Sequence, residues 1–222
     1  MRLTCISLLA AAAALASGND ADLRVPCCPA TATAAFTTAI PSGDPCPATR
    51  VSLCYTGTAL QLVFAAEGAG EPYFNATQGT NDDIWAYEVM EAFIHRGQDD
   101  PQQYFEYEVS PNNVTYNAFV YNPSRERKAG APFDHAFVEN PFDDGFAVNT
   151  VLDAHAETWT SVVSIPLALF NGENPKGSTW RMNFFRTITN ATMFPDQKLC
   201  GWRNPGKPNF HITGAFGTVR FV

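Results

Sequence analysis

Three glutamates occupy positions where the sequence predicts β-strands, and a charged side chain in a strand needs a physical reason. Glu91 lies within an expected strand over residues 87–94, and Glu106 and Glu108 lie within another over residues 104–109. Two carboxylates from separate strands can act as the acid and base of a glycoside hydrolase when they meet across a cleft. They can also accept hydrogen bonds from sugar hydroxyls, or simply face solvent from one side of a sheet. The residue types leave these three interpretations open.

No other set of reactive residues matches a known catalytic motif. The sequence lacks the G-x-S-x-G turn that carries a nucleophilic serine in hydrolases. It also lacks the H-E-x-x-H zinc motif and a phosphate-binding glycine loop. His155-Ala156-Glu157 matches the start of a zinc deaminase motif, but no P-C-x-x-C follows it. This pattern favours a binding protein over an enzyme, with a glycoside hydrolase as the alternative.

Pairs of adjacent aspartates form a second group of candidate ligands. Such pairs in turns usually cap the backbone or face solvent. Loops that supply several oxygen atoms can also hold Ca²⁺, although no EF-hand spacing is present here. A structural calcium ion is therefore a possible cofactor, with no ligand set assigned. The pairs are Asp82-Asp83, Asp99-Asp100 and Asp143-Asp144.

The N-terminus has the features of a secretory signal peptide. A basic residue, Arg2, precedes a largely apolar run over residues 3–16 that ends in small residues, so we expect residues 1–18 to be removed. Three N-glycosylation sequons support export and predict a secreted, extracellular glycoprotein. The sequons begin at Asn75, Asn113 and Asn190.

The net charge of the chain is −8. Nucleic acids and anionic membrane surfaces both require a basic surface, so the acidic balance argues against either partner. No later segment is long and apolar enough to span a bilayer, which predicts no membrane insertion. A neutral partner such as carbohydrate is compatible with this composition.

Five cysteines follow the predicted signal peptide, and an exported chain favours disulfides. Because five is odd, one thiol is free or pairs elsewhere. Adjacent cysteines rarely bond each other, so we expect Cys27 or Cys28, or both, to pair with a later cysteine. A zinc site is the weaker interpretation, because no C-x-x-C pair is present. The candidates for pairing are Cys46, Cys54 and Cys200.

Alternation of apolar and polar residues predicts about nine short strands separated by turns, which is typical of an all-β fold. We therefore expect an antiparallel β-sandwich with a jelly-roll or immunoglobulin-like arrangement of two sheets. One turn of helix is expected at residues 166–170. The expected strands cover residues 50–55, 60–64, 87–94, 104–109, 114–121, 147–153, 158–165, 179–187 and 218–222.

The chain after the signal peptide is expected to form a single domain. Residues 19–48 are rich in Cys, Pro and Ala and predict an extended lead-in that disulfides hold in place. Residues 49–222 form the sandwich domain. Residues 122–144 are irregular and long for a bare connection, so they either carry function or wrap the edge of the sandwich.

The aromatic content, 13%, is high enough to supply both a core and a binding platform. A sugar site needs an aromatic face against the C–H face of the ring, and polar side chains for the hydroxyls. Trp85 follows a polar run and is a candidate exposed platform, although a core position at a strand end is equally compatible. This requirement makes carbohydrate a plausible ligand class.

Four short segments, taken in order, resemble carbohydrate-binding module family 9. The resemblance covers roughly residues 49–222 and implies a β-sandwich that holds a sugar ring between two aromatic side chains. Family members also hold structural calcium. The segments are Ile84 to Ile94, with the pattern of a Trp followed by Met-Glu-x-Phe; Trp159 to Leu167; Trp180 to Arg186; and Phe210 to Gly217.

The resemblance implies a set of ligand-binding residues. The first aromatic of the family site maps to Trp85 and the acidic residue after it to Glu91. The second aromatic maps to Phe210, where the family has Trp, and a polar residue maps to Asn183. Well-known members carry an Arg-x-Asn pair on the next strand. This chain has Glu106 and Glu108 there, which predicts a different sugar preference.

Side-chain alternation places Asn183 and Phe185 on the face opposite the core, while Trp180, Met182 and Phe184 face inward. This placement agrees with a polar role for Asn183. Arg186 and His211 are expected to hydrogen-bond within the fold.

A third interpretation is a haem-binding redox domain, because related sandwiches hold haem between a Met and a His. Met90 and His211 are the candidate ligands, although nothing in their spacing supports ligation. Met in a strand is more often part of the core. The favoured function is therefore a non-catalytic carbohydrate-binding protein.

Overall fold

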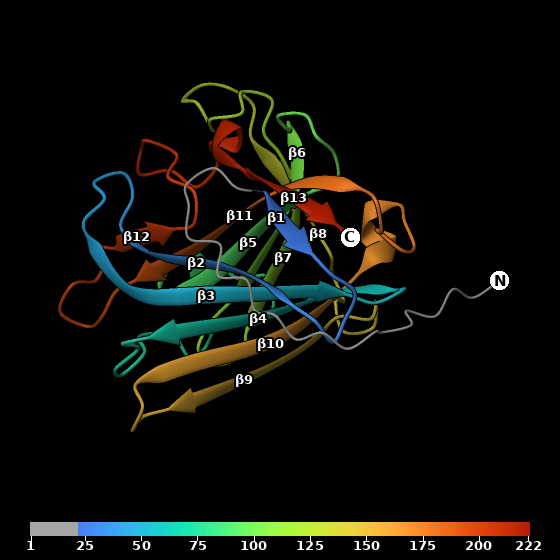
Figure 1. Ribbon diagram of the computed structural model, residues 1–222. Coiled ribbons are helices and arrows are strands. Elements are labelled where there is room, and N and C mark those ends of the chain that lie inside the picture. The colour runs from blue at the N-terminus through green and yellow to red at the C-terminus, as the bar shows by residue number, and fades with distance from the viewer. Residues whose placement is uncertain (1–21) are drawn as a thin grey trace.

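A computed structural model describes residues 22–222, so the predicted signal peptide at residues 1–18 lies outside the described residues. The described chain forms two β-sheets that pack face to face (Figure 1). All strand pairs are antiparallel except β1 with β13, which is parallel. The predicted two-sheet antiparallel sandwich is confirmed, with this one parallel pair as the exception.

The larger sheet has eight strands. β12 (Lys198–Gly201) pairs with β11 beside the main path. The main path runs in the order β1 (Leu23–Val25), β13 (Gly217–Phe221), β11 (Thr179–Ile188), β5 (Val89–His95), β6 (Gln103–Val109), β7 (Thr115–Tyr121) and β8 (Asp134–Phe137).

The smaller sheet has five strands and forms the lower layer in Figure 1. Short 3-10 helices η1 (Ile84–Ala86), η2 (Leu167–Phe170) and η3 (Thr213–Ala215) connect strands, and η2 confirms the helical turn expected there. The order of strands is β2 (Ala32–Thr38), β3 (Pro45–Tyr55), β4 (Ala59–Glu67), β10 (Thr158–Pro166) and β9 (Ala147–Asp153).

All nine strands expected from alternation are present, with bounds shifted by a few residues. Four further strands, β1, β2, β8 and β12, were not expected. β2 has the sequence ATAAFTT, in which small and polar residues dilute the apolar pattern. β1, β8 and β12 have only three or four residues each, too few to show a period.

The chain ahead of residue 49 supplies strands to both sheets. β1 joins the edge of the large sheet, and β2 forms an edge of the small one. Disulfides Cys28–Cys54 and Cys46–Cys200 tie this segment to later strands, which confirms the expected forward pairing. Cys27 is disulfide-bonded too, and none of the five described cysteines is a free thiol.

The main core lies between the sheets and draws on alternate residues of each strand. From the large sheet, Met90, Phe105, Trp180 and Phe184 point into this core. Among residues 22–222, no helix has the length and apolar character needed to cross a membrane.

The other face of the large sheet, called the outer face here, carries a second apolar cluster. Phe93, Tyr104, Val120 and Phe185 from four neighbouring strands pack there with Phe210 from the segment after β12. Loops therefore cover this face of the sheet, although alternation alone predicts that it meets solvent. The covering loops create the site described next.

Candidate functional site

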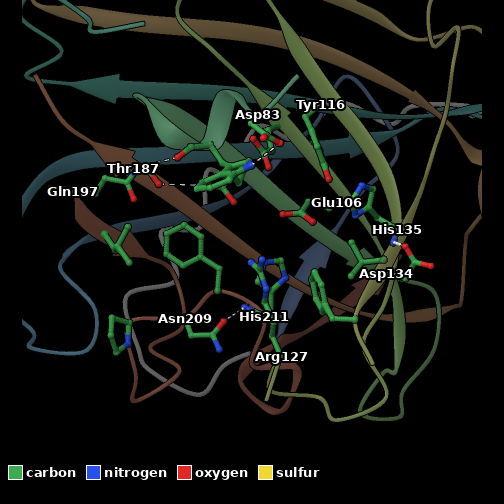
Figure 2. Close-up of a pocket in the computed structure, with 18 residues that line it drawn as sticks. Asp83, Glu106, Tyr116, Arg127, Asp134, His135, Thr187, Gln197, Asn209 and His211 are labelled. Atoms are coloured by element: carbon green, nitrogen blue, oxygen red, sulfur yellow. Dashed lines mark hydrogen bonds between the residues drawn. The ribbon is translucent and has the colours of Figure 1, made fainter. Parts of the chain in front are cut away.

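A cavity of about 530 Å³ opens on the outer face of the large sheet. Its volume lies within the range of ordinary small-molecule sites, about 300–1,000 Å³. Aromatic and charged side chains line it together (Figure 2). The lining residues are Asp83, Trp85, Glu91, Glu106, Glu108, Tyr116, Val120, Arg127, Phe133, Asp134, His135, Thr187, Gln197, Leu199, Pro208, Asn209, Phe210 and His211.

Three carboxylates meet in this cavity: Glu91, Glu106 and Glu108, together called the acid trio. Strand register brings them together, because Glu91 on β5 pairs directly with Glu108 on β6, and Glu106 is two residues away on the same face. One oxygen atom from each of the three lies within 4.8 Å of the others, and all three residues are buried. The sequence predicted the residues as candidates but did not show that they touch.

Burial and mutual repulsion change the acid trio's protonation. Desolvation raises the pKa of Glu106 to about 8, although nearby Arg127 opposes part of this effect. Desolvation also raises the pKa of Glu91 and Glu108 well above the usual range, and the neighbouring glutamates add to it. Burial therefore favours the protonated form of the trio near neutral pH.

Hydrogen bonding within the protein satisfies the trio only in part. The Thr187 hydroxyl donates to Glu91 Oε1 at 3.3 Å. The Glu108 Oε2 atom is buried and has no hydrogen-bond partner among the described residues. Buried polar atoms are rarely left in this state, because each costs about 1–3 kcal/mol. The trio thus leaves a hydrogen-bonding atom, Glu108 Oε2, available to a ligand in the cavity.

Trp85 supplies an exposed aromatic surface at the cavity. It lies on η1 and is 49% exposed, so the structure selects the exposed alternative over the core one. Its Nε1 donates to Asp83 Oδ1 at 3.2 Å, and Gln197 Nε2 donates to its backbone oxygen at 2.8 Å. These contacts hold the indole in place while leaving about half of its surface free.

Phe210 also lines the cavity, but it is largely buried. Its ring stacks on Phe185 with a centroid distance of 4.0 Å and an interplanar angle of 11°. It therefore belongs to the outer-face apolar cluster as well as to the cavity wall.

The structure brings five of the six predicted residues to one cavity, and Asn183 is the exception. Asn183 lies on the predicted face of β11, opposite the core, but it is fully buried and absent from the lining. Its Oδ1 accepts hydrogen bonds from the backbone N–H groups of Phe184 and Arg203, and its Nδ2 donates to the Arg203 backbone oxygen. Its side chain is therefore occupied in holding the chain after β12.

The irregular segment at residues 122–144 supplies residues that sequence reasoning did not assign to the site. Arg127, Phe133, Asp134 and His135 from this segment line the cavity. The Arg127 guanidinium lies over the Phe133 ring, 4.5 Å from its centroid. The unusual length of the segment was the signal that it could carry function.

His211 forms part of the wall near Arg127, as Figure 2 shows. Its Nδ1 is hydrogen-bonded to the Tyr104 hydroxyl at 2.7 Å, which confirms the expected bond within the fold. Desolvation, with a contribution from Arg127, lowers the pKa of His211 to about 3. The imidazole is therefore neutral at physiological pH and adds no positive charge to the cavity.

Haem ligation by Met90 and His211 is contradicted by their positions. Met90 is buried between the two sheets, whereas His211 lines the cavity on the outer face. One iron atom cannot bind both, because the large sheet lies between them.

The paired aspartates do not form a metal site of three or more acidic, His or Cys side chains within the described residues. The acid trio is the group with that geometry. Asp82 accepts a hydrogen bond from the Gly79 backbone, and Asp100 accepts one from the Thr213 hydroxyl. These aspartates thus have local roles in their loops.

The fold is that of a carbohydrate-binding module of family 9. Two solved structures of such a module from Caldicellulosiruptor kristjanssonii align with TM-scores of 0.56 and 0.59, at 13% and 11% identity. These alignments cover 84% and 90% of this chain, and 83% and 93% of the modules. A candidate carbohydrate-binding protein from Bacteroides uniformis aligns with a TM-score of 0.67 at 17% identity, over 93% of this chain and all of that one.

A much closer relative defines the family. The chain is 51% identical, over 222 residues and the whole length of both proteins, to a protein of Arthroderma benhamiae named "Extracellular protein". It belongs to the same family as that protein. No known protein-family profile matches the chain.

Proposed function

We propose that the protein is a secreted, non-catalytic carbohydrate-binding protein, and that the outer-face cavity is its ligand site. The observation that carries this proposal is the composition of the cavity. An exposed indole, Trp85, lies beside buried polar groups that have unused hydrogen-bonding capacity. Stacking on the indole and hydrogen bonding at the trio are the two contacts that a sugar ring requires.

The comparisons support the same ligand class. The family 9 modules of similar fold were solved in complex with glucose and with cellotriose. Fold likeness at such low identity does not transfer a ligand by itself, so the proposal depends on the cavity.

Secretion agrees with several features of the chain. The relative from Arthroderma benhamiae is named an extracellular protein, and disulfides are typical of exported proteins. The sequons at Asn113 and Asn190 are exposed, as an attached glycan requires. We propose that the mature protein is an extracellular glycoprotein.

The arrangement of the acid trio gives no specific support for a glycoside hydrolase. Retaining and inverting hydrolases hold their two carboxyl groups about 5–9.5 Å apart, on opposite sides of the scissile bond. The trio's carboxyl groups all project from one face of the sheet, from the neighbouring strands β5 and β6, rather than from two opposite walls. Glu91, Glu106 and Glu108 are therefore proposed to bind ligand without cleaving it.

A glycan array tests the proposal. The purified glycosylated protein should bind a defined set of glycans, and Trp85→Ala should reduce that binding by about tenfold or more, since it removes an aromatic stacking surface. Phe142→Ala is the matched control, because Phe142 is equally exposed and lies outside the cavity lining.

Two outcomes would contradict the proposal. The first is no binding to any plant, fungal or bacterial glycan by a correctly folded protein. The second is equal loss of binding in Trp85→Ala and Phe142→Ala, which would place the ligand elsewhere.

A further inference from the structure

The acid trio has no ion pair among the described residues that would hold its carboxyl groups ionised. Its three carboxyl groups are buried within 4.8 Å of one another, and Glu108 Oε2 has no hydrogen-bond partner among the described residues. Removing carboxylates from water is strongly unfavourable unless they are protonated or paired with a cation. The trio lines the cavity, so a cationic ligand that bound there would stabilise its ionised form.

The rest of the cavity lining supplies more carboxyl groups than basic side chains. Asp83 and Asp134 add two further carboxylates, and Arg127 is the one Arg or Lys side chain in the lining. Arg127 is exposed, lies over the Phe133 ring and offsets only part of the effect of burial on the pKa of Glu106. The other titratable groups of the lining are Tyr116, His135 and the neutral His211.

An ammonium group fits the geometry of the trio. It carries one positive charge and three N–H donors, which matches three carboxyl acceptors. Three acceptors placed tetrahedrally at about 2.8 Å from a nitrogen atom are roughly 4.6 Å apart. One oxygen from each trio residue lies within 4.8 Å of the others, which is compatible with this spacing.

The cavity walls favour an organic cation over a metal ion. Ca²⁺ takes six to eight oxygen ligands, and its sites are built from carboxylates, carbonyls and water. Here Trp85, Tyr116 and Phe210 line the same cavity as the trio. Its volume of about 530 Å³ is large enough for an organic ligand. Aromatic faces attract both a sugar ring and a cation.

We propose that the cavity recognises an amino sugar with a free primary ammonium group, such as a deacetylated hexosamine, and that the acid trio binds this ammonium. The proposal rests on the proposed carbohydrate-binding function and specifies its ligand class. The sugar ring would lie against Trp85 while its ammonium group reaches the trio.

Calorimetry at pH 6 with three matched trisaccharides tests the inference. The probes are a glucosamine trimer, its fully N-acetylated counterpart, and cellotriose, each measured with EDTA present and again with Ca²⁺. We expect the glucosamine trimer to bind at least tenfold more tightly than both neutral sugars, with no requirement for Ca²⁺.

The outcomes separate this inference from the broader function. Equal or tighter binding of a neutral trisaccharide would overturn the ammonium inference and leave carbohydrate binding intact. Binding that requires Ca²⁺ would also overturn it, in favour of a metal at the trio. No binding of any sugar would overturn both.

Variants of the trio locate the effect. Glu108→Gln and Glu91→Gln keep the side-chain shape and remove a carboxyl group, and each should weaken glucosamine-trimer binding at least tenfold. Glu173→Gln is the matched control, because Glu173 is exposed and outside the lining. Thermal melting verifies that each variant is folded, and unchanged glucosamine binding in both folded trio variants would contradict the inference.

Proton release gives a second readout that needs no variant. Burial raises the pKa of each trio carboxyl group, so an ammonium that ionises the trio on binding should displace protons. The binding enthalpy of the glucosamine trimer should therefore differ between buffers with different ionisation enthalpies. An enthalpy independent of the buffer would contradict the inference.

Discussion

Both faces of the large sheet bury ionisable side chains, but within the described chain only those on the inner face form an ion pair. On the inner face, Arg186 forms a buried ion pair with Glu88 at 2.7 Å and donates to the Glu67 backbone oxygen on the small sheet at 2.8 Å. On the outer face, the acid trio has no ion pair with any described Arg or Lys within 4.0 Å.

The difference separates a structural role from a binding role. A buried charge with a partner completes the fold, because removing that partner leaves an uncompensated charge. A buried group of like charges works against folding, and such groups are concentrated at functional sites. The comparison therefore assigns Arg186 and Glu88 to stability, and the trio to ligand binding.

The largest effect is expected from breaking the inner pair. Arg186→Met leaves Glu88 buried without its partner, and unfolding free energy should fall by about 3–5 kcal/mol. Chemical denaturation measures the change. Combining Arg186→Met with Glu88→Gln should recover part of the loss. If Arg186→Met alone were as stable as the wild type, the structural role assigned to the Arg186–Glu88 pair would be wrong.

Phe210→Ala should produce the next largest loss. The ring is largely buried and stacks on Phe185 in the outer-face cluster, so truncation should cost about 3 kcal/mol and also weaken sugar binding. Denaturation and glycan binding can be measured on the same sample. Phe142→Ala, at an exposed site, is the control and should change stability little. Full stability in Phe210→Ala would show that the cluster does not support the cavity.

The trio predicts a distinctive dependence of stability on pH. The pKa of Glu106 is raised from 4.5 to about 8 in the folded protein, so the folded state holds a proton that the unfolded state has already lost. Stability should therefore fall as pH rises from about 4.5 to 8, by at most about 1.4 kcal/mol per pH unit for each such group.

Glu106→Gln tests this dependence directly. It cannot ionise, so the slope of unfolding free energy against pH should become flatter over the same range. Glu173→Gln should leave the slope unchanged. A wild-type stability that rises between pH 5 and 8 would show that the trio does not dominate the pH response.

The smallest effect on stability is expected at Trp85. Because its indole is half exposed, Trp85→Ala should change the unfolding free energy by about 0.5 kcal/mol or less while weakening sugar binding. Denaturation and binding curves together give the ratio of the two effects. A large stability loss without any binding loss would make Trp85 a structural residue.

Most of the fold could be predicted from the sequence because its strands alternate in the ordinary way. Segments such as Val51-x-Leu53-x-Tyr55 show their inward face directly. β2 and β12 could not be predicted, because their pairing with longer strands stabilises them more than their own composition does. Local propensity is a weak guide for such short strands.

The site could be predicted only as a collection of residues. Each member of the trio was visible as a charge in a strand, but their contact depends on the register between β5 and β6. The side chain of Asn183 faces the predicted side, yet hydrogen bonds to Arg203 occupy it. The loops that bury the outer face come from residues 122–144 and from the chain after β12, and their positions are set by long-range packing.

Tryptophan fluorescence tests the central claim most directly, because one tryptophan at the cavity is exposed while Trp159 and Trp180 are fully buried and Trp202 is intermediate. The measurement is acrylamide quenching with and without a saturating oligosaccharide from the glycan array. The account predicts that bound sugar protects the wild type from quenching and gives no protection in Trp85→Phe. Equal protection in the two proteins, or none in the wild type despite bound sugar, would contradict a ligand site at this cavity.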